Sequence, residues 1–165
     1  FGGRAVCIDG SADPPEVQLP GGLRLVLLSP DVSALERLRS HWRKAMDRAG
    51  SSPDDAAAVE RRLRVDRRYR DAGVAAPSVG LMRELAGMDS TLDDAVANGS
   101  SIAFVAEYAG RRCAFLADAH APLVEASLRR LARRHGKSRL RLDALKVAHH
   151  GSQDNTTAAL LKAVD

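Results

Sequence analysis

The segment that decides the fold is SIAFVAEYAGRRCAFLADAHAPLVEASLRRLARRHGKSRLRLDALKVAHHGS, residues 101–152. It begins with two apolar runs joined by a tight glycine turn, which predicts a β-hairpin of residues 101–108 and 111–118. Pro122 stands at the start of a predicted helix, where its missing N–H is tolerated. The apolar run 142–149 predicts a further strand. A hairpin followed by a helical crossover predicts a mixed sheet covered by helices, in the α/β (α+β) class.

Upstream of this segment the sequence also predicts strands and a helix, as the α/β (α+β) class requires. Residues 23–30 (LRLVLLSP) predict a strand, and the short apolar stretch 3–9 predicts another. Between them, residues 10–22 are rich in proline and glycine and predict a turn-rich connector. A helix follows, for which Asp31 or Ser29 can serve as the N-cap by accepting a backbone N–H.

The composition bounds the class of protein. Hydrophobic residues make up 45% of the 165 and charged residues 28%, which is typical of a globular domain. We therefore treat residues 1–165 as part of one domain, with a variable, partly helical insertion at about 51–97, where strand signals are few. No run of about 18 apolar residues is present, which excludes a membrane-spanning helix of the usual kind.

Two cysteines, Cys7 and Cys113, stand singly in apolar stretches. No CxxC spacing supports a thiolate metal site, so we interpret them as buried thiols in a reducing compartment. A disulfide between them is the alternative. With no signal-peptide pattern at the start, the sequence predicts a cytoplasmic location.

The net charge is +4, and arginines cluster at 60–71 and 128–143. A basic face of this kind can meet nucleic acid. Acidic residues interleave with the arginines, however, which favours an ordinary solvated helix face.

Side chains of the metal-binding type follow two predicted strands. Asp118 and His120 follow the second hairpin strand, and His149 and His150 follow the last strand. Taken alone, the aspartate is typical of a turn and the histidine pair of a loop that enters a helix. Together, joined by a helical crossover, they indicate a metal site, because imidazole and carboxylate suit zinc, manganese or iron. Further on, Asn155 is placed to cap a last helix.

These residues carry a family resemblance. The stretch 116–131 (LADAHAPLVEASLRRL) followed by 142–161 (LDALKVAHHGSQDNTTAALL) resembles the end of metallo-β-lactamase-fold hydrolases. It is most similar to the branch that includes hydrolase domains of competence-type DNA-uptake proteins. The hairpin 98–118 and the segment 19–30 resemble other strands of that fold. The resemblance covers most of the chain outside the insertion and implies one half of a four-layer αββα sandwich.

The resemblance also implies roles for single residues. Asp118 matches the aspartate that bridges two metal ions, and either His149 or His150 matches the ligand of the second site. We prefer His150 because it directly precedes a glycine, which leaves His149 beside the site. His120 would face the substrate cleft, with a helix-entry residue as the alternative, and Ser152 would hydrogen-bond within its loop and near substrate. The implied cofactors are two divalent ions, zinc or else manganese.

The chain departs from the family pattern in two ways. Leu-Ala stands before Asp118 where Thr-Gly is usual, and the signature His-x-His-x-Asp-His occurs nowhere in the sequence. The resemblance therefore implies the C-terminal half of a metal-dependent hydrolase of phosphodiesters, inactive without an N-terminal half. The apparent strand at Phe1 favours a first half encoded upstream or on another chain. The alternative is a non-catalytic half-domain that docks on a partner or binds nucleic acid through its arginine-rich helices.

Overall fold

The computed structural model describes residues 6–10, 13–49 and 94–165. The chain divides into two compact units, Phe1–Leu38 with Ser90–Asp165, and Arg39–Asp89. The sheet and all predicted site residues belong to the first unit. The predicted insertion falls mostly on residues 50–93, which lie outside the described residues.

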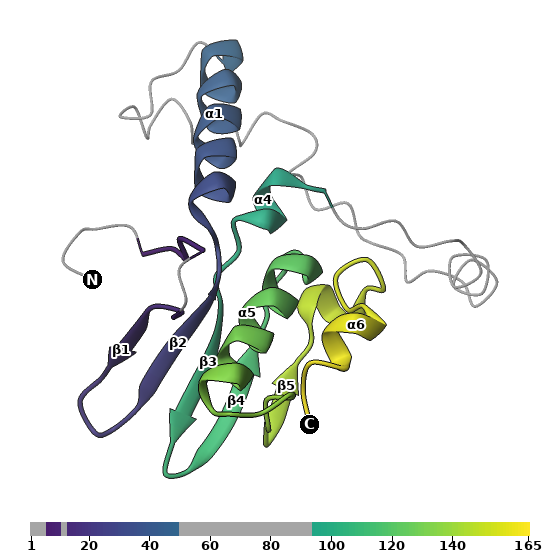
Figure 1. The fold of residues 1–165 in the computed structure, drawn as a ribbon. Helices are drawn as coiled ribbons and strands as arrows, with labels where there is room; N and C mark the ends of the chain where they lie inside the picture. The colour runs from purple at the N-terminus through teal and green to yellow at the C-terminus, as the bar shows by residue number, and fades with distance from the viewer. Residues whose placement is uncertain (1–5, 11–12, 50–93) are drawn as a thin grey trace, which may run out of the picture. The chain divides into compact units, whose positions relative to one another are not determined.

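The first unit is built on a five-stranded mixed sheet (Figure 1). Its strands lie in the order β1 (Glu16–Gln18), β2 (Arg24–Ser29), β3 (Ala103–Tyr108), β4 (Arg111–Phe115) and β5 (Ala144–Lys146). The first three pairings are antiparallel, and β4 pairs with β5 in parallel. The mixed sheet predicted from a hairpin followed by a helical crossover is thus confirmed, whereas the four-layer sandwich stays a prediction.

Helices lie between and after these strands along the chain. They are α1 (Val32–Ala49), α4 (Val96–Gly99), α5 (Ala121–Arg134), the 3-10 turn η2 (Ala148–Gly151) and α6 (Ala158–Leu161). Asp31 caps α1 as predicted, because its Oδ1 accepts the N–H of Ala34 at 2.7 Å. None of the described helices has both the length and the apolarity that crossing a membrane requires.

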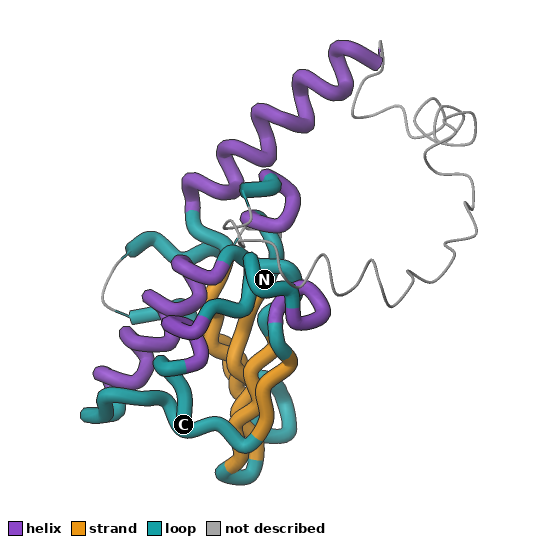
Figure 2. The backbone as a smooth tube through the Cα atoms, turned by 90° about the vertical axis from the view of Figure 1, so that its right-hand side faces the viewer, coloured by secondary structure: helices purple, strands orange, loops and turns teal. Residues whose placement is uncertain are grey.

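The core lies between one face of the sheet and helix α5, and Figure 2 shows α5 and α6 on the same side of the strands. Alternate residues of each strand point to this face, because successive side chains of a strand point to opposite sides. The apolar stripe of α5 packs on them. The fully buried members are Val26, Leu28, Val105, Ala114, Leu116, Val124, Leu128 and Leu131.

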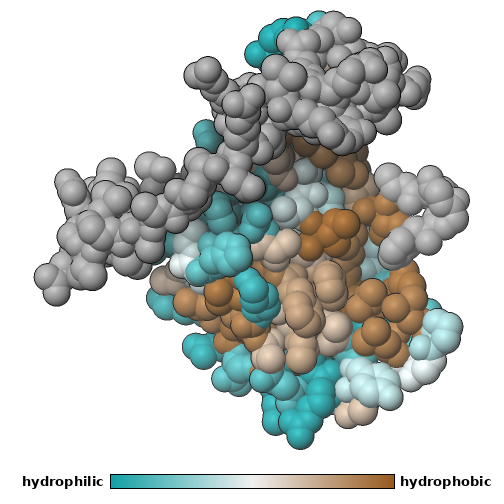
Figure 3. Space-filling view, turned by 180° about the vertical axis from the view of Figure 1, so that it is seen from behind, coloured by the Kyte–Doolittle hydropathy of each residue, from teal (hydrophilic) through white to brown (hydrophobic). Residues whose placement is uncertain are grey.

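The other face of the sheet is apolar and, within the described residues, has no helix packed on it. Phe104 and Phe115 stack on this face with ring centroids 5.2 Å apart, and Phe115 is 42% exposed. A groove of about 440 Å³ beside them is lined mainly by apolar side chains of β1, β2 and β3 and of the neighbouring loops. Figure 3 shows apolar residues gathered over the strands on this side.

Several predicted elements differ in extent from the structure. The described part of the predicted strand 3–9 forms only an isolated bridge between Ile8 and Asp31, and the second hairpin strand ends at Phe115 instead of residue 118. The connector 10–22 contains the short strand β1, which pairs with β2 although its sequence is rich in breakers. The predicted strand 142–149 is regular over β5 alone, because the backbone turns at Val147 into η2. This turn places the two histidines in a loop instead of a strand.

Candidate metal centre

The predicted ligands lie at one edge of the sheet. Strands β4 and β5 are parallel and are connected through α5, so their carboxyl ends meet at the same edge. Asp118 follows β4, and His149 and His150 follow β5. The two loops touch through the backbone, because the N–H of His149 donates to the carbonyl oxygen of Ala117 at 2.8 Å. The structure therefore brings these predicted ligand segments together.

The backbone of both loops adopts an uncommon conformation. Ala117, His149 and His150 have φ angles of 48°, 43° and 55°, in the left-handed region that non-glycine residues rarely occupy. Each such residue costs on the order of 1 kcal/mol or more. Strain of this kind persists only where the surroundings hold it, and it concentrates at functional sites. Both loops therefore need contacts with the rest of the chain that hold the backbone in this conformation.

Asn155 holds the two loops together from beneath. Its side chain is fully buried, and Nδ2 lies 3.2 Å from the carbonyl oxygen of Asp118 and 3.5 Å from that of Ala119. Carbonyl oxygens only accept hydrogen bonds, so the amide nitrogen faces them and Oδ1 faces Nδ1 of His149 at 3.2 Å. His149 Nδ1 must then carry the proton and donate it, which leaves the lone pair on Nε2.

The expected role of Asn155 was wrong. Thr157 is the N-cap of α6, because its Oγ1 accepts the N–H of Leu160 at 3.2 Å. Asn155 lies two residues earlier, where its side chain turns inward beneath the loops. Its position shortly after the histidine pair was the only signal in the sequence, and that position does not distinguish a cap from a buried link.

The side chains of Asp118 and His150 have no hydrogen-bond partner among the described residues. His150 is exposed and Asp118 half-buried. Their carboxylate and imidazole are therefore available to a ligand from outside this part of the chain. His149 is also exposed, but its ring is fixed by the hydrogen bond to Asn155.

The two predicted substrate contacts bind to the chain itself. His120 Nε2 donates to the carbonyl oxygen of Ala95 at 3.1 Å, and its ring lies against Gly99 at the end of α4. Ser152 Oγ accepts the N–H of Asp154 at 3.3 Å, so the predicted hydrogen bond within the loop is confirmed. Contact of either residue with a substrate stays a prediction.

The donor set is incomplete within the described residues. No group of three or more His, Cys, Asp or Glu side chains that could hold a metal ion is found there. The donor chemistry of Asp118 with one histidine suits zinc or manganese, but the number of donors falls short of the usual four ligands. Comparisons of the chain with protein-family models, curated proteins and solved structures found no match.

Proposed function

We propose that this chain supplies one side of the metal site of a metallo-β-lactamase-fold hydrolase that acts on phosphodiesters. The observation that carries the proposal is the meeting of two strained loops at the carboxyl ends of adjacent parallel strands, with a buried Asn155 between them. A site on strand ends holds its ligands within the narrow tolerance that coordination requires. The residue types at these ends, carboxylate and imidazole, suit a divalent ion.

Asp118 would bridge two ions, and one of the histidines would bind the second. The sequence favoured His150, but the hydrogen bond from Nδ1 of His149 to Asn155 supports His149. A ligating histidine almost always donates its other ring N–H to an oxygen, which fixes the tautomer and turns the lone pair toward the metal. When bound, zinc or manganese lowers the pKa of a coordinated water toward neutrality.

Other residues of this chain would orient the metal ligands and hold them in place. Asn155 fixes the ring of His149. It also donates to the carbonyl oxygens of Asp118 and Ala119, which holds the backbone that follows Asp118. Ser152 closes the histidine loop, because its N–H donates to the carbonyl oxygen of His149 at 3.0 Å. The exposed ring of His150 would then lie beside the ligands, where it can contact a phosphoryl oxygen.

The remaining donors would come from an N-terminal half that carries His-x-His-x-Asp-His. The apolar face of the sheet supports such a partner, since Phe104, Phe115 and Ile102 lie on it and Ile102 is 62% exposed. Soluble proteins rarely leave a contiguous apolar face of this kind uncovered. A second sheet packed about 10 Å away would cover it.

A non-catalytic half-domain is the second candidate. The observation that favours it is the lack of a three-ligand group among the described residues. Such a half-domain would use the same apolar face for docking but would have no need of metal. The two functions therefore differ in metal binding and not in the partner surface.

The test is metal analysis of the full-length natural protein together with hydrolysis of bis(4-nitrophenyl) phosphate. The hydrolase function predicts about two zinc or manganese ions per chain. Asp118→Ala should abolish hydrolysis and lower metal content, whereas Asp154→Ala, which removes a nearby carboxylate, should change neither. His149→Ala and His150→Ala identify the ligand as the one that lowers metal content. A full-length protein without metal or hydrolysis would refute the hydrolase and leave the docking half-domain.

A further inference from the structure

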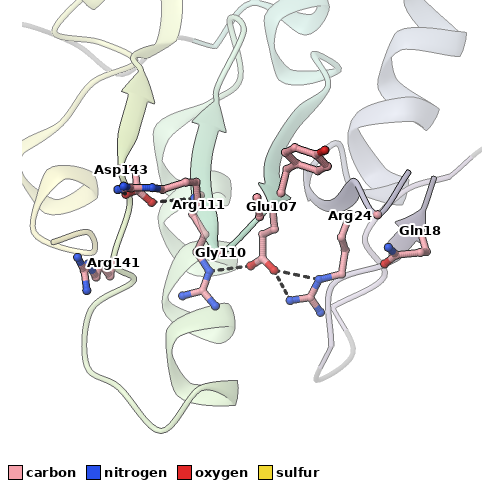
Figure 4. Close-up of a pocket in the computed structure, with 11 residues that line it drawn as sticks. Gln18, Arg24, Glu107, Gly110, Arg111, Arg141 and Asp143 are labelled. Atoms are coloured by element: carbon pink, nitrogen blue, oxygen red, sulfur yellow. Dashed lines mark hydrogen bonds and ion pairs between the residues drawn. The ribbon is translucent and has the colours of Figure 1, made fainter. Parts of the chain in front are cut away.

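A second pocket lies at the hairpin end of the sheet, where β3 turns into β4 (Figure 4). It is separated from the candidate metal centre by the length of β4, because Arg111 begins that strand and Asp118 follows its end. Its volume is about 640 Å³, within the range of about 300–1,000 Å³ that small-ligand sites occupy. Four arginines and two carboxylates line it, so its wall is basic and strongly polar.

One wall of the pocket is a row of three charged side chains. Glu107 lies directly opposite Arg24 of β2 and Arg112 of β4 in the sheet register. Arg24 donates to Glu107 Oε2 through Nε at 2.9 Å and also through Nη2, and Arg112 Nε donates to Oε1 at 2.8 Å. The carboxylate is 13% exposed, so the pairs are largely shielded from water. Both guanidinium groups are thereby held in one orientation before any ligand arrives.

Burial raises the pKa of Glu107, but the hydrogen bonds and charges of Arg24 and Arg112 outweigh it and hold that pKa below the ordinary value. The carboxylate is therefore ionised at neutral pH, and each of its oxygens already accepts from a guanidinium group. Arg112 uses Nε for Glu107 and Nη2 for His135, with 3.3 Å to His135 Nε2. Its Nη1 has no hydrogen-bond partner among the described residues.

The opposite wall carries the surplus charge. Arg111 Nη1 donates to Asp143 Oδ1 at 2.6 Å, which pairs those two groups. Arg141 also lines the pocket and has no ion pair or hydrogen bond to the described residues. Four guanidinium groups stand against the two carboxylates of the lining and Glu16, which pairs with Arg24 at 3.3 Å, so positive charge remains in excess. A phosphate anion would balance this excess.

We propose that this pocket binds a phosphate group, with Arg141 and the Nη1 of Arg112 as its main contacts. Arginine forks match phosphate oxygens in geometry and charge. Tyr108 is 60% exposed, but it follows Glu107 in β3, so its ring points to the other face of the sheet, away from Arg112. The site does not depend on the proposed hydrolase, because it shares no residue with the metal centre.

The test measures binding of three probes to the full chain by isothermal titration in the presence of EDTA, which keeps metal out of the other site. The probes are inorganic phosphate, ADP and a short single-stranded oligothymidylate. Arg141→Gln should weaken all three by roughly tenfold, as the loss of a hydrogen bond between charged groups does. Arg139→Gln removes the same charge from an exposed position two residues away and should change binding by no more than about twofold.

Tyr108→Leu, on the other face of β3, is a further control and should leave the binding of all three probes unchanged. Tighter binding of the oligonucleotide than of ADP identifies a nucleic-acid strand as the source of the phosphate, and the reverse identifies a free nucleotide. The proposal is overturned if no probe binds, or if Arg139→Gln and Arg141→Gln weaken binding equally, since diffuse surface charge then explains it.

Discussion

At the scale of single residues, the buried Asn155 and the part-buried Glu107 organise the two ends of the sheet. Asn155 links the loops that carry Asp118 and His149, and Glu107 pairs with two arginines at the opposite end. In both cases one side chain satisfies several partners that burial would otherwise leave unpaired. Removing such a group costs more than the bonds themselves, because the desolvated partners remain.

Replacing Asn155 by alanine is expected to lower the free energy of unfolding by about 1–3 kcal/mol, because buried carbonyls of Asp118 and Ala119 lose a donor. Guanidinium denaturation measures the effect. Gln153→Ala, at an exposed position in the same loop, is the control and should stay within about 0.5 kcal/mol. Equal stability of the two variants would contradict the role given to Asn155.

The Glu107 cluster predicts a pH dependence of stability. The pKa of Glu107 lies below its ordinary value of 4.5 in the folded chain, so the folded state binds the proton less readily than the unfolded state. Its contribution is complete above about pH 4.5 and is lost as the pH falls through the folded pKa. Glu107→Gln should therefore be less stable at pH 7 and lose less stability on acidification.

Denaturation at several pH values between about 7 and 3 measures this slope. Glu36→Gln removes a carboxylate from an exposed position of α1 and should leave the slope as in the wild type. Parallel curves for the wild type and Glu107→Gln would refute the argument.

At the scale of elements, the contact between α4 and the start of α5 positions the loop that carries Asp118. Gly99 ends α4 against the ring of His120, and a Cβ built on Gly99 would lie 2.7 Å from His120 Cε1. The ring cannot turn away without breaking its hydrogen bond to Ala95. Glycine is therefore needed at this position for space, since its φ is not in the left-handed region.

Gly99→Ala is expected to lower the free energy of unfolding by about 1–3 kcal/mol, as overpacking does. In the double variant Gly99→Ala/His120→Ala the clash is relieved, so the two effects should not add. A double-mutant cycle by thermal or denaturant unfolding measures the coupling. Additive effects would show that the two residues do not oppose one another.

At the scale of the whole first unit, helices of the described part cover one face of the sheet and leave the other apolar. The pair Phe104 and Phe115 lies on the uncovered face, and Leu161 lies on α6 on the helical side. Phe115 and Leu161 are similarly exposed, at 42% and 44%. Comparing changes at Phe115 and Leu161 therefore separates an effect of the uncovered face from a general effect of exposed apolar area.

Phe115→Glu is expected to reduce the fluorescence of a hydrophobic dye bound to the chain and to block association with an N-terminal half, because a charge cannot be buried between sheets without a partner. Leu161→Glu, the control, should do neither. Dye titration and size-exclusion chromatography make the two measurements. Equal effects of the two changes would show that the uncovered face has no special role.

Local sequence patterns determined much of the fold. Apolar runs and turn residues predicted β2, the β3–β4 hairpin, α1 with its Asp31 cap, and α5 from Pro122. The alternation of hairpin and crossover also predicted the mixed sheet. These features depend on neighbours within a few residues or on hydrophobic periodicity, which the sequence displays directly. The short β1 escaped because its pairing with β2 outweighs a local preference for turns.

In the candidate site, too, some features follow from the local sequence and others only from tertiary contacts. The sequence by itself determined which residue types follow the two strands, and so predicted Asp118, His149 and His150 as one group. Only the tertiary structure decided that Asn155 lies beneath them and not at a helix cap, and that Arg24, Glu107 and Arg112 form one row. Those contacts join residues distant along the chain, and they depend on strand register and loop conformation, which no local pattern encodes.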